Sequence, residues 1–240
     1  MFGGNVPMNQ TQFNNGAGSA VASRTNTMLP RVFLLMFMGL TMTAIIAYVL
    51  GTNQDVVQSL LQNSGIFWGI WVVQLVLVIG LSALIHRIPA FVANIAFFVY
   101  AAVTGVSFSV LMVFFSLDSI AGAFFIAAGM FGISALVGYT TKMDLSKIGF
   151  LALMLVLGLI LASLVNIFFL KSSMIELIIS YAMVILFTIV TAFDMQTIKH
   201  MSEMDMDEEN VNKYAIYGAL MLYIDFIMIF RNLLTILNDD

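Results

Sequence analysis

The sequence predicts an all-α integral membrane protein, a bundle of seven transmembrane helices, and three observations lead to this prediction. Hydrophobic residues make up 61% of the 240 residues and charged residues only 9%, whereas a soluble domain is roughly a quarter charged. Seven apolar segments are each long enough to cross the hydrocarbon, which takes about 20 residues of helix. Short connections between most of them indicate consecutive antiparallel helices in a single domain.

The first 30 residues are rich in Asn, Gln, Gly, Thr and Ser and have no apolar periodicity, so residues 1–30 are expected to form a flexible polar tail. No basic start followed by a short apolar stretch precedes Arg31, so we expect no cleaved signal peptide. The transmembrane domain then comprises residues 31–240. Its expected spans are approximately 32–51, 66–85, 91–114, 119–139, 148–170, 174–198 and 214–236.

The distribution of Lys and Arg predicts that the N-terminus is cytoplasmic and the C-terminus outside. Cytoplasmic loops of membrane proteins accumulate basic residues. With the N-terminus inside, only Lys171 and Arg231 fall on or near the other side. The short loops and the absence of targeting signals favour a bacterial inner membrane. The basic residues then placed on the cytoplasmic side are Arg24, Arg31, Arg87, Lys142, Lys147, Lys199 and Lys213.

Asp194 and Asp225 are the strongest candidates for a functional site, because each is an acid inside a long apolar run and the two lie on consecutive predicted helices. A carboxylate at bilayer depth costs about 3 kcal/mol or more and is uncommon there unless it faces a protein interior. Asp194 lies about one helical turn before Lys199, near the cytoplasmic end of its helix. Arg87, which follows the second span, is the nearest candidate for a cationic partner. We expect Asp194, Asp225 and Arg87 to meet at one site.

Two neighbouring carboxylates resist ionising together, so the pair is expected to share a proton and to titrate as a unit near neutral pH. Such a pair suits either the sensing of cytoplasmic acidity or the binding of a hard cation. Calcium prefers about six to eight oxygen ligands, so Asp194 and Asp225 are expected to bind calcium only transiently. The alternative is that each acid hydrogen-bonds a neighbouring helix and only fixes the packing.

Two further polar residues share helix faces with the acids. Glu176 precedes Asp194 by five helical turns, so both project from one face about 27 Å apart. Asn232 lies on the same face of the last helix as Asp225. Together Glu176 and Asn232 are candidates for an ion pathway, although Glu176 is also close enough to the outer interface to reach water.

Two connecting segments have simpler interpretations. Asp144, between the fourth and fifth spans, is expected to cap the next helix. The acidic loop from Glu203 to Glu209 is expected to be a solvated linker, because it lacks the ligand spacing and the Gly of an EF-hand. The chain has no cysteine, which excludes thiolate metal sites and thiol catalysis. No cofactor and no nucleic-acid partner are expected.

Three segments carry a resemblance to a known family: VGYTTKMDLSKIGFLAL, VTAFDMQTIKHM and ALMLYIDFIMIFRNLLTIL. They are similar to the transmembrane Bax inhibitor motif family, in the family's order, and the resemblance extends over essentially all seven spans. Its bacterial members are described as pH-sensitive calcium leak channels with paired aspartates on the last two helices. By this resemblance the paired acids are Asp194 and Asp225, and the family's latch arginine is Arg87. Phe193 and Met195 replace two hydroxyl residues of the family's Tyr-Asp-Thr-Gln, so the pH of opening is expected to differ.

Three functional hypotheses follow. The first is a passive cation pathway, favouring calcium, that opens when protonation of the Asp194 and Asp225 pair frees Arg87. The second is a non-conducting regulator that binds another membrane protein, such as a quality-control protease, and uses the acids only for packing. The third, an intramembrane aspartyl protease, requires Gly-x-Gly-Asp where this chain has Leu-Tyr-Ile-Asp at residues 222–225. No nucleotide-binding loop or HExxH motif occurs either, so an enzyme is not expected. The expected partners are the lipid bilayer and calcium.

Overall fold

The structure is a computed structural model that describes residues 10–85 and 87–238. Within these residues every regular element is a helix, as the sequence predicts. The elements are α1 (Gln10–Gly51), α2 (Gln54–Gln62), α3 (Ser64–Leu84), α4 (Ala90–Ser109), α5 (Leu111–Phe114), α6 (Leu117–Thr140), α7 (Ser146–Val165), the π-helical turn η1 (Asn166–Leu170), α8 (Ser173–Ser202) and α9 (Glu208–Leu237).

Seven segments of the described chain are long and apolar enough to cross a membrane, which confirms the predicted fold class. Apart from the first helix, the largest difference is at the start of the last span, predicted at residue 214 and found at Glu208. Side-chain caps explain several helix starts, since a Ser or Asp oxygen accepts one of the first amides that have no partner within the helix. Ser116 caps α6, Ser172 caps α8 and Asp207 caps α9.

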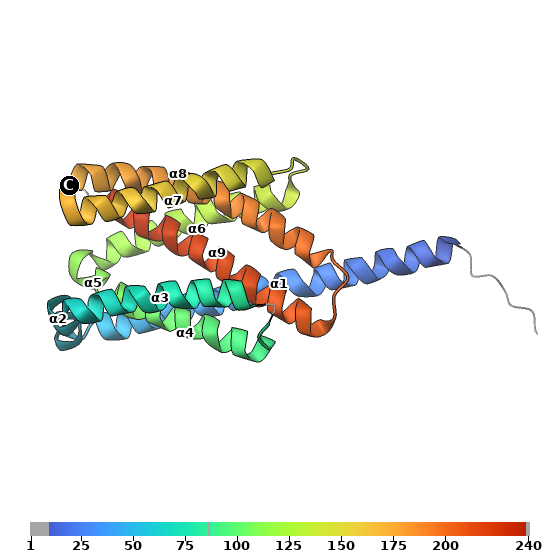
Figure 1. Cartoon of the computed structure of the whole chain (residues 1–240), viewed down its shortest axis with the longest axis horizontal. Coiled ribbons are helices and arrows are strands. Elements are labelled where there is room, and N and C mark those ends of the chain that lie inside the picture. Colours follow the sequence, from blue (N-terminus) through green and yellow to red (C-terminus); the bar gives the residue numbers. More distant parts are fainter. Residues whose placement is uncertain (1–9, 86, 239–240) are drawn as a thin grey trace, which may run out of the picture.

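The helix α9 lies between two groups of three helices (Figure 1). One group contains α1, α3 and α4, and the other contains α6, α7 and α8. At one end of the bundle α4, α7 and α9 begin and α3, α6 and α8 end. We call this the basic end, because Arg31, Arg87, Lys142, Lys199 and Lys213 lie at or near it. The opposite end carries α2 and the C-terminus.

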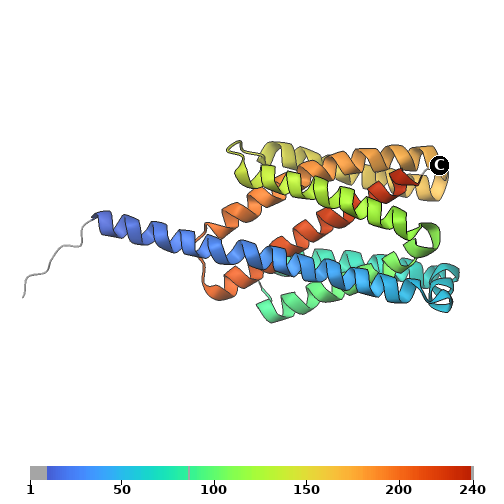
Figure 2. The ribbon, with the colours of Figure 1, turned by 180° about the vertical axis from the view of Figure 1, so that it is seen from behind.

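The predicted tail differs from the structure, because α1 continues without interruption from Gln10 to Gly51. Figure 2 shows this helix projecting beyond the rest of the bundle at the basic end. Once a span has nucleated, each added residue contributes a further hydrogen bond, and the helix extends. Of the segment predicted to be a flexible tail, residues 1–9 lie outside the described residues.

The short helix α2 was not predicted. It fills the connection between the first two spans, and Asn53 caps it by accepting the amides of Asp55 and Val56. Val57 and Leu60 are buried on one face. The sequence does carry a signal for this helix, which the prediction missed: two apolar residues three positions apart follow an Asn that can act as the N-cap.

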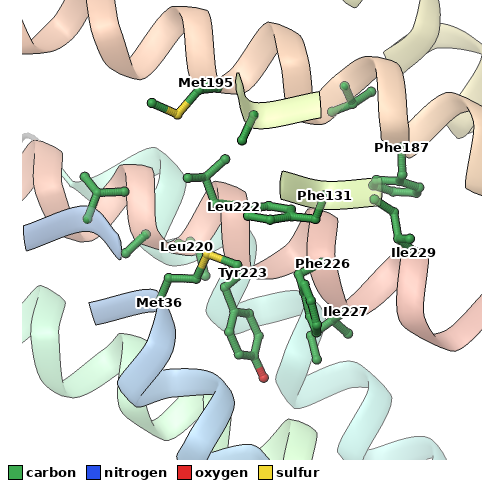
Figure 3. Close-up of a cluster of buried hydrophobic side chains, with 14 of the residues drawn as sticks. Met36, Phe131, Phe187, Met195, Leu220, Leu222, Tyr223, Phe226, Ile227 and Ile229 are labelled. Atoms are coloured by element: carbon green, nitrogen blue, oxygen red, sulfur yellow. The ribbon is translucent and has the colours of Figure 1, made fainter. Parts of the chain in front are cut away.

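The buried core is centred on α9 (Figure 3). Tyr223 is fully buried, and its hydroxyl lies 2.6 Å from the hydroxyl of Thr43 on α1. Its ring makes edge contacts with Phe97 and Tyr100 of α4, at centroid distances of 5.8 and 5.7 Å. This contact joins α1, α4 and α9 and fixes α9 against the first group of helices.

Candidate functional site

The structure brings Asp194 of α8 and Asp225 of α9 together. Their side-chain carboxyl groups lie within hydrogen-bonding reach of each other. Both residues are buried, with only 7% of Asp194 and 2% of Asp225 exposed. The acids therefore face the protein interior and not the lipid.

The site has more hydrogen-bond acceptors than donors. An ionised carboxylate has no proton to donate, so a hydrogen bond between Asp194 and Asp225 requires a proton on one of them. Thr191 also lies within reach of Asp225, but its hydroxyl donates to the Phe187 carbonyl oxygen at 2.7 Å. The Oδ2 atom of Asp225 is buried and has no hydrogen-bond partner among the described residues. A proton shared by the two carboxyl groups would supply the missing donor.

Close helix contacts hold α8 in place directly before Asp194. A Cβ atom added at Gly138 of α6 would overlap the backbone of Ala192, and one added at Gly149 of α7 would overlap Phe193. The absence of side chains at these glycines lets the helices approach closely, as small residues do in membrane bundles. Because α8 is fixed by α6 and α7, Asp194 has a fixed position.

The loop between α6 and α7 is attached to α8 just beyond Asp194. The amide side chain of Gln196 accepts a hydrogen bond from the Leu145 amide at 2.9 Å and donates one to the Met143 carbonyl at 2.8 Å. Lys199 donates to the Tyr139 carbonyl at 2.9 Å and also lies over the Tyr139 ring. This loop therefore supports the helix that carries Asp194.

Asp144, which was predicted to cap the helix after this loop, accepts a hydrogen bond at the start of that helix. Its Oδ1 accepts the Ser146 amide at 2.9 Å at the start of α7, although the residue at the N-cap position itself is Leu145. Hydrogen bonds from Ser146, first from its side chain and then from its backbone, hold the pKa of the Asp144 carboxyl below its ordinary value.

Aromatic rings fill the space between α6 and α9 beyond the acid pair, towards the opposite end. Phe226, directly after Asp225, contacts Phe131 and Phe124 at centroid distances of 5.8 and 5.4 Å (Figure 3 shows the first pair). Phe230 contacts Phe124 at 6.4 Å and Phe108 at 5.8 Å. We call these five rings the aromatic column. Phe131, Phe226 and Phe230 are buried, whereas Phe124 is exposed, so the column reaches from the interior to the surface on this side of the pair.

The structure does not bring Arg87 to the acid pair, which corrects the expected three-residue site. Arg87 is exposed in the turn after α3, and within the described chain it makes no hydrogen bond or ion pair with either aspartate. The physical reason is that α3 lies at the periphery and packs mainly on α4. A basic residue that does join the helices at this end is Arg31 of α1, which donates to Asn212 of α9 at 2.6 Å.

Glu176 and Asn232, the candidates for an ion pathway, are also not brought to the pair. Glu176 is exposed in the first turn of α8, where it interacts electrostatically with Arg231 of α9. The guanidinium of Arg231 lies 5.3 Å from the centre of the Trp71 ring. Asn232 donates to the Met228 carbonyl of its own helix at 2.7 Å. Both polar groups thus have local partners near the opposite end.

The pair does not fit a resident calcium site. It supplies two carboxyl groups and the Thr191 hydroxyl, fewer oxygens than the six to eight or so that calcium prefers. Among the described residues, no group of three or more His, Cys, Asp or Glu side chains is placed so that it could hold a metal ion. Transient contact of calcium with Asp194 and Asp225 stays a prediction.

The acidic loop, predicted to be a solvated linker, also stabilises the start of α9. Asp207 caps α9 by accepting the Asn210 amide at 2.8 Å. Glu209 accepts the Ala90 amide at 2.9 Å, which ties the start of α9 to the start of α4. Glu208 lies 3.8 Å from Arg31.

Three residues near the pair were missed by the sequence reasoning. Thr191 precedes Asp194 by three residues, a spacing that places both on one helix face. Tyr217 of α9 lies within electrostatic range of Asp194, and Gln196 follows the acid by two residues. The helical spacing identifies Thr191 from the sequence, whereas the other two depend on how the helices pack.

Comparison with known proteins gives consistent matches over nearly the whole chain. A family model described as the inhibitor of apoptosis-promoting Bax1 matches residues 25–240. The inner membrane protein YbhL of Escherichia coli strain K12 is 41% identical over 215 residues, which cover 89% of this chain and 92% of that protein. An uncharacterised protein of Borreliella burgdorferi is 38% identical over 215 residues, with the same coverages of 89% and 92%. One from Deinococcus radiodurans is 38% identical over 216 residues, covering 90% of this chain and 92% of that protein.

Proposed function

The chain belongs to the Bax inhibitor family of membrane proteins, and we propose that it is a pH-sensitive cation leak pathway, favouring calcium, gated by the proton shared between Asp194 and Asp225. The observation that carries the proposal is the buried contact between these two carboxyl groups on the adjacent helices α8 and α9. Two acids within the membrane cost free energy. Titratable groups in such perturbed surroundings occur mainly at functional sites, which favours a function for the pair.

The contact suggests how the gate works. With a shared proton the pair joins α8 to α9, and the aromatic column stays closed. When that proton is lost, two like charges are left in contact and repel each other by on the order of a few kcal/mol. Because Gly138 and Gly149 hold α8 against α6 and α7, and the Tyr223 contact joins α9 to α1 and α4, α9 moves away from α8 together with α1 and α4. Its movement withdraws Phe226 and Phe230 from the aromatic column and opens the path.

This scheme replaces the expected release of Arg87. The sequence-based mechanism opens the pathway by protonation, which requires an ion pair between Arg87 and the aspartates. Arg87 is exposed outside the bundle interior, so the ion pair that this mechanism requires is not formed among the described residues. Opening is therefore assigned to loss of the shared proton, and the leak is expected to increase as the pH rises.

The cation is the transported species and not a cofactor. Once the pair is ionised, Asp194 and Asp225 offer hard oxygen ligands, which suit calcium. Few ligands mean weak binding, and weak binding allows an ion to leave as well as to enter. No catalytic step is assigned to this protein.

We assign the protein to a bacterial inner membrane, with the basic end facing the cytoplasm. The K12 relative is named an inner membrane protein. The basic residues at one end of the bundle support the orientation, because Lys and Arg accumulate on the cytoplasmic side. In this proposed orientation the N-terminus is inside and the C-terminus outside, and we expect the pair to respond to protons from the cytoplasm.

The test is calcium flux into proteoliposomes that contain a calcium-sensitive dye, with equal pH on both sides, between about pH 6 and 8. For the native chain the initial rate is expected to rise by up to about tenfold per pH unit, the limit for one proton. Asp194→Asn and Asp225→Asn are each expected to give a low rate without pH dependence, because an amide cannot ionise. Asp118→Asn changes an exposed acid at the start of α6 and is the matched control.

Three results would count against this proposal in different ways. Absence of flux at every pH rejects the leak and favours a non-conducting regulator. Flux that neither aspartate substitution alters removes the pair as the gate. Flux that increases as the pH falls contradicts the direction given above and favours opening by protonation.

A further inference from the structure

Two adjoining cavities form one groove along the outside of α1 and α4. The first, of about 290 Å³, is lined by residues of α1, α4 and α9 that include Arg31, Asn94 and Asn212. The second, of about 320 Å³, is lined only by residues of α1 and α4. Both cavities include Phe91 and Asn94 in their walls, so they meet at these residues. We call the whole the α1–α4 groove.

The part of the groove at the basic end contains three polar residues, Arg31, Asn94 and Asn212, among apolar walls, and it has unused hydrogen-bonding capacity. Arg31 donates to Asn212 and lies 3.8 Å from Glu208, but the Glu208 side chain is 83% exposed and that of Arg31 39% exposed. An exposed ion pair of this kind contributes little, and a guanidinium has further N–H donors. The Oδ1 atom of Asn94 is buried and has no hydrogen-bond partner within the described chain. The groove thus offers a cation and an acceptor that needs a donor.

The other part of the groove is apolar. Apart from Asn94, where the cavities meet, its walls are Met42, Phe91, Ile95, Phe98, Val99, Ala102 and Val103. On α4 these residues extend from Phe91 to Val103, about 18 Å along a helix axis. One leaflet of the hydrocarbon is about 15 Å thick. The apolar part therefore has the length of a lipid chain in one leaflet.

We propose that the α1–α4 groove binds one phospholipid from the leaflet at the basic end. The phosphate contacts Arg31, a hydroxyl or ammonium of the headgroup donates to Asn94 Oδ1, and one acyl chain lies along α4 from Phe91 to Val103. Charge complementarity between guanidinium and phosphate favours this occupant, and basic pockets between membrane helices are known to bind lipid headgroups. The apolar continuation favours a lipid over a soluble anion.

The headgroup preference follows from the acceptor at Asn94. Phosphatidylglycerol and phosphatidylethanolamine each carry a phosphate and a hydrogen-bond donor. Phosphatidylcholine carries the phosphate but has no N–H or O–H in its headgroup. The groove is therefore expected to retain the first two lipids better than the third.

The test is native mass spectrometry of the purified full chain with phosphatidylglycerol, phosphatidylethanolamine or phosphatidylcholine added one at a time. Arg31→Gln is expected to lower the retention of phosphatidylglycerol about tenfold. Arg87→Gln removes an exposed cation from the same end but outside the groove, and it is expected to leave retention unchanged. Asn94→Leu is expected to abolish the difference between phosphatidylglycerol and phosphatidylcholine.

A second pair of variants tests the apolar part without altering charge. Ala102→Phe fills the groove and is expected to lower the retention of all three lipids, whereas Ala121→Phe changes an exposed residue of α6 and is expected to have no effect. If Arg31→Gln fails to fold, Ala102→Phe and Asn94→Leu decide the matter. Equal retention in Ala102→Phe and Ala121→Phe would overturn the proposal, as would displacement of the lipid by inorganic phosphate, which would identify a soluble anion as the occupant.

Discussion

The helices α9 and α3 both have the length and apolar character of a membrane span, but they differ in position. Both are apolar spans, with a mean hydropathy of 1.8 for α9 and 2.2 for α3. Yet 56% of the α9 span is buried inside the bundle, and only 6% of the α3 span is. In lipid an apolar side chain gains little by leaving the surface, so hydrophobicity does not select the central helix. The less apolar helix is central because its polar residues must be shielded from lipid.

Glycines show the same contrast between the central and peripheral regions. At Gly138 and Gly149, which face α8, an added Cβ would overlap a neighbouring helix. At Gly69 and Gly80 of α3 an added Cβ would meet nothing within 4 Å. A small residue is therefore required at the first two positions and has no packing function at the other two.

Gly138→Val gives the largest expected effect on this comparison. The valine side chain would overlap the backbone of Ala192, and α6 and α8 would have to separate. Overpacking costs about 3 kcal/mol, or more where backbone is displaced. Gly80→Val, the matched control on α3, is expected to change the free energy of unfolding by about 0.5 kcal/mol or less. Unfolding of both variants in detergent measures the difference, and equal stability would show that α6 does not hold α8.

The dependence of stability on pH is the next largest effect. In the proposed mechanism the folded pair holds a shared proton, which two separate aspartates in the unfolded chain do not retain at neutral pH. The folded state then binds more protons than the unfolded state, so the free energy of unfolding falls as the pH rises, by up to about 1.4 kcal/mol per unit. Asp225→Asn is expected to abolish this slope, because its amide can donate to an ionised Asp194. Denaturant unfolding at several pH values measures the slope, and an unchanged slope in the variant would exclude the shared proton.

A smaller effect is expected from removing polar contacts in the two regions. Gln196→Ala removes both hydrogen bonds that attach the α6–α7 loop to α8 and is expected to cost about 2 kcal/mol. Gln74→Ala removes the hydrogen bond that Gln74 of α3 donates to Thr104 of α4, at 3.1 Å, and is expected to cost about 0.6 kcal/mol. Thermal unfolding shows which variant loses more stability, and a larger loss in Gln74→Ala would contradict the tighter attachment of α8 than of α3.

The sequence was sufficient to predict the spans and to select both aspartates. Apolar length determines a span, and an acid within a span stands out because it is costly there. The same reasoning failed for Arg87, because the end of a helix in the sequence does not determine which neighbour it packs against. Gln196 and Tyr217 were missed for a similar reason. Their proximity to the site depends on the rotation of α8 and α9 about their axes, which nearly uniform hydrophobicity does not determine.

The smallest effect is expected from Asp144, which lies outside the spans and is exposed. Hydrogen bonds from Ser146 lower the pKa of its carboxyl, so the stabilisation is present above the ordinary pKa of an aspartate and is lost as the pH falls through the lowered value. Asp144→Ala is therefore expected to lower the Tm slightly at neutral pH and to equal the native chain in strong acid. Scanning calorimetry at neutral and acidic pH measures both values. A difference that persisted in acid would mean that Asp144 supports the loop by packing and not by its charge, and would place the α6–α7 loop among the tightly packed parts of the bundle.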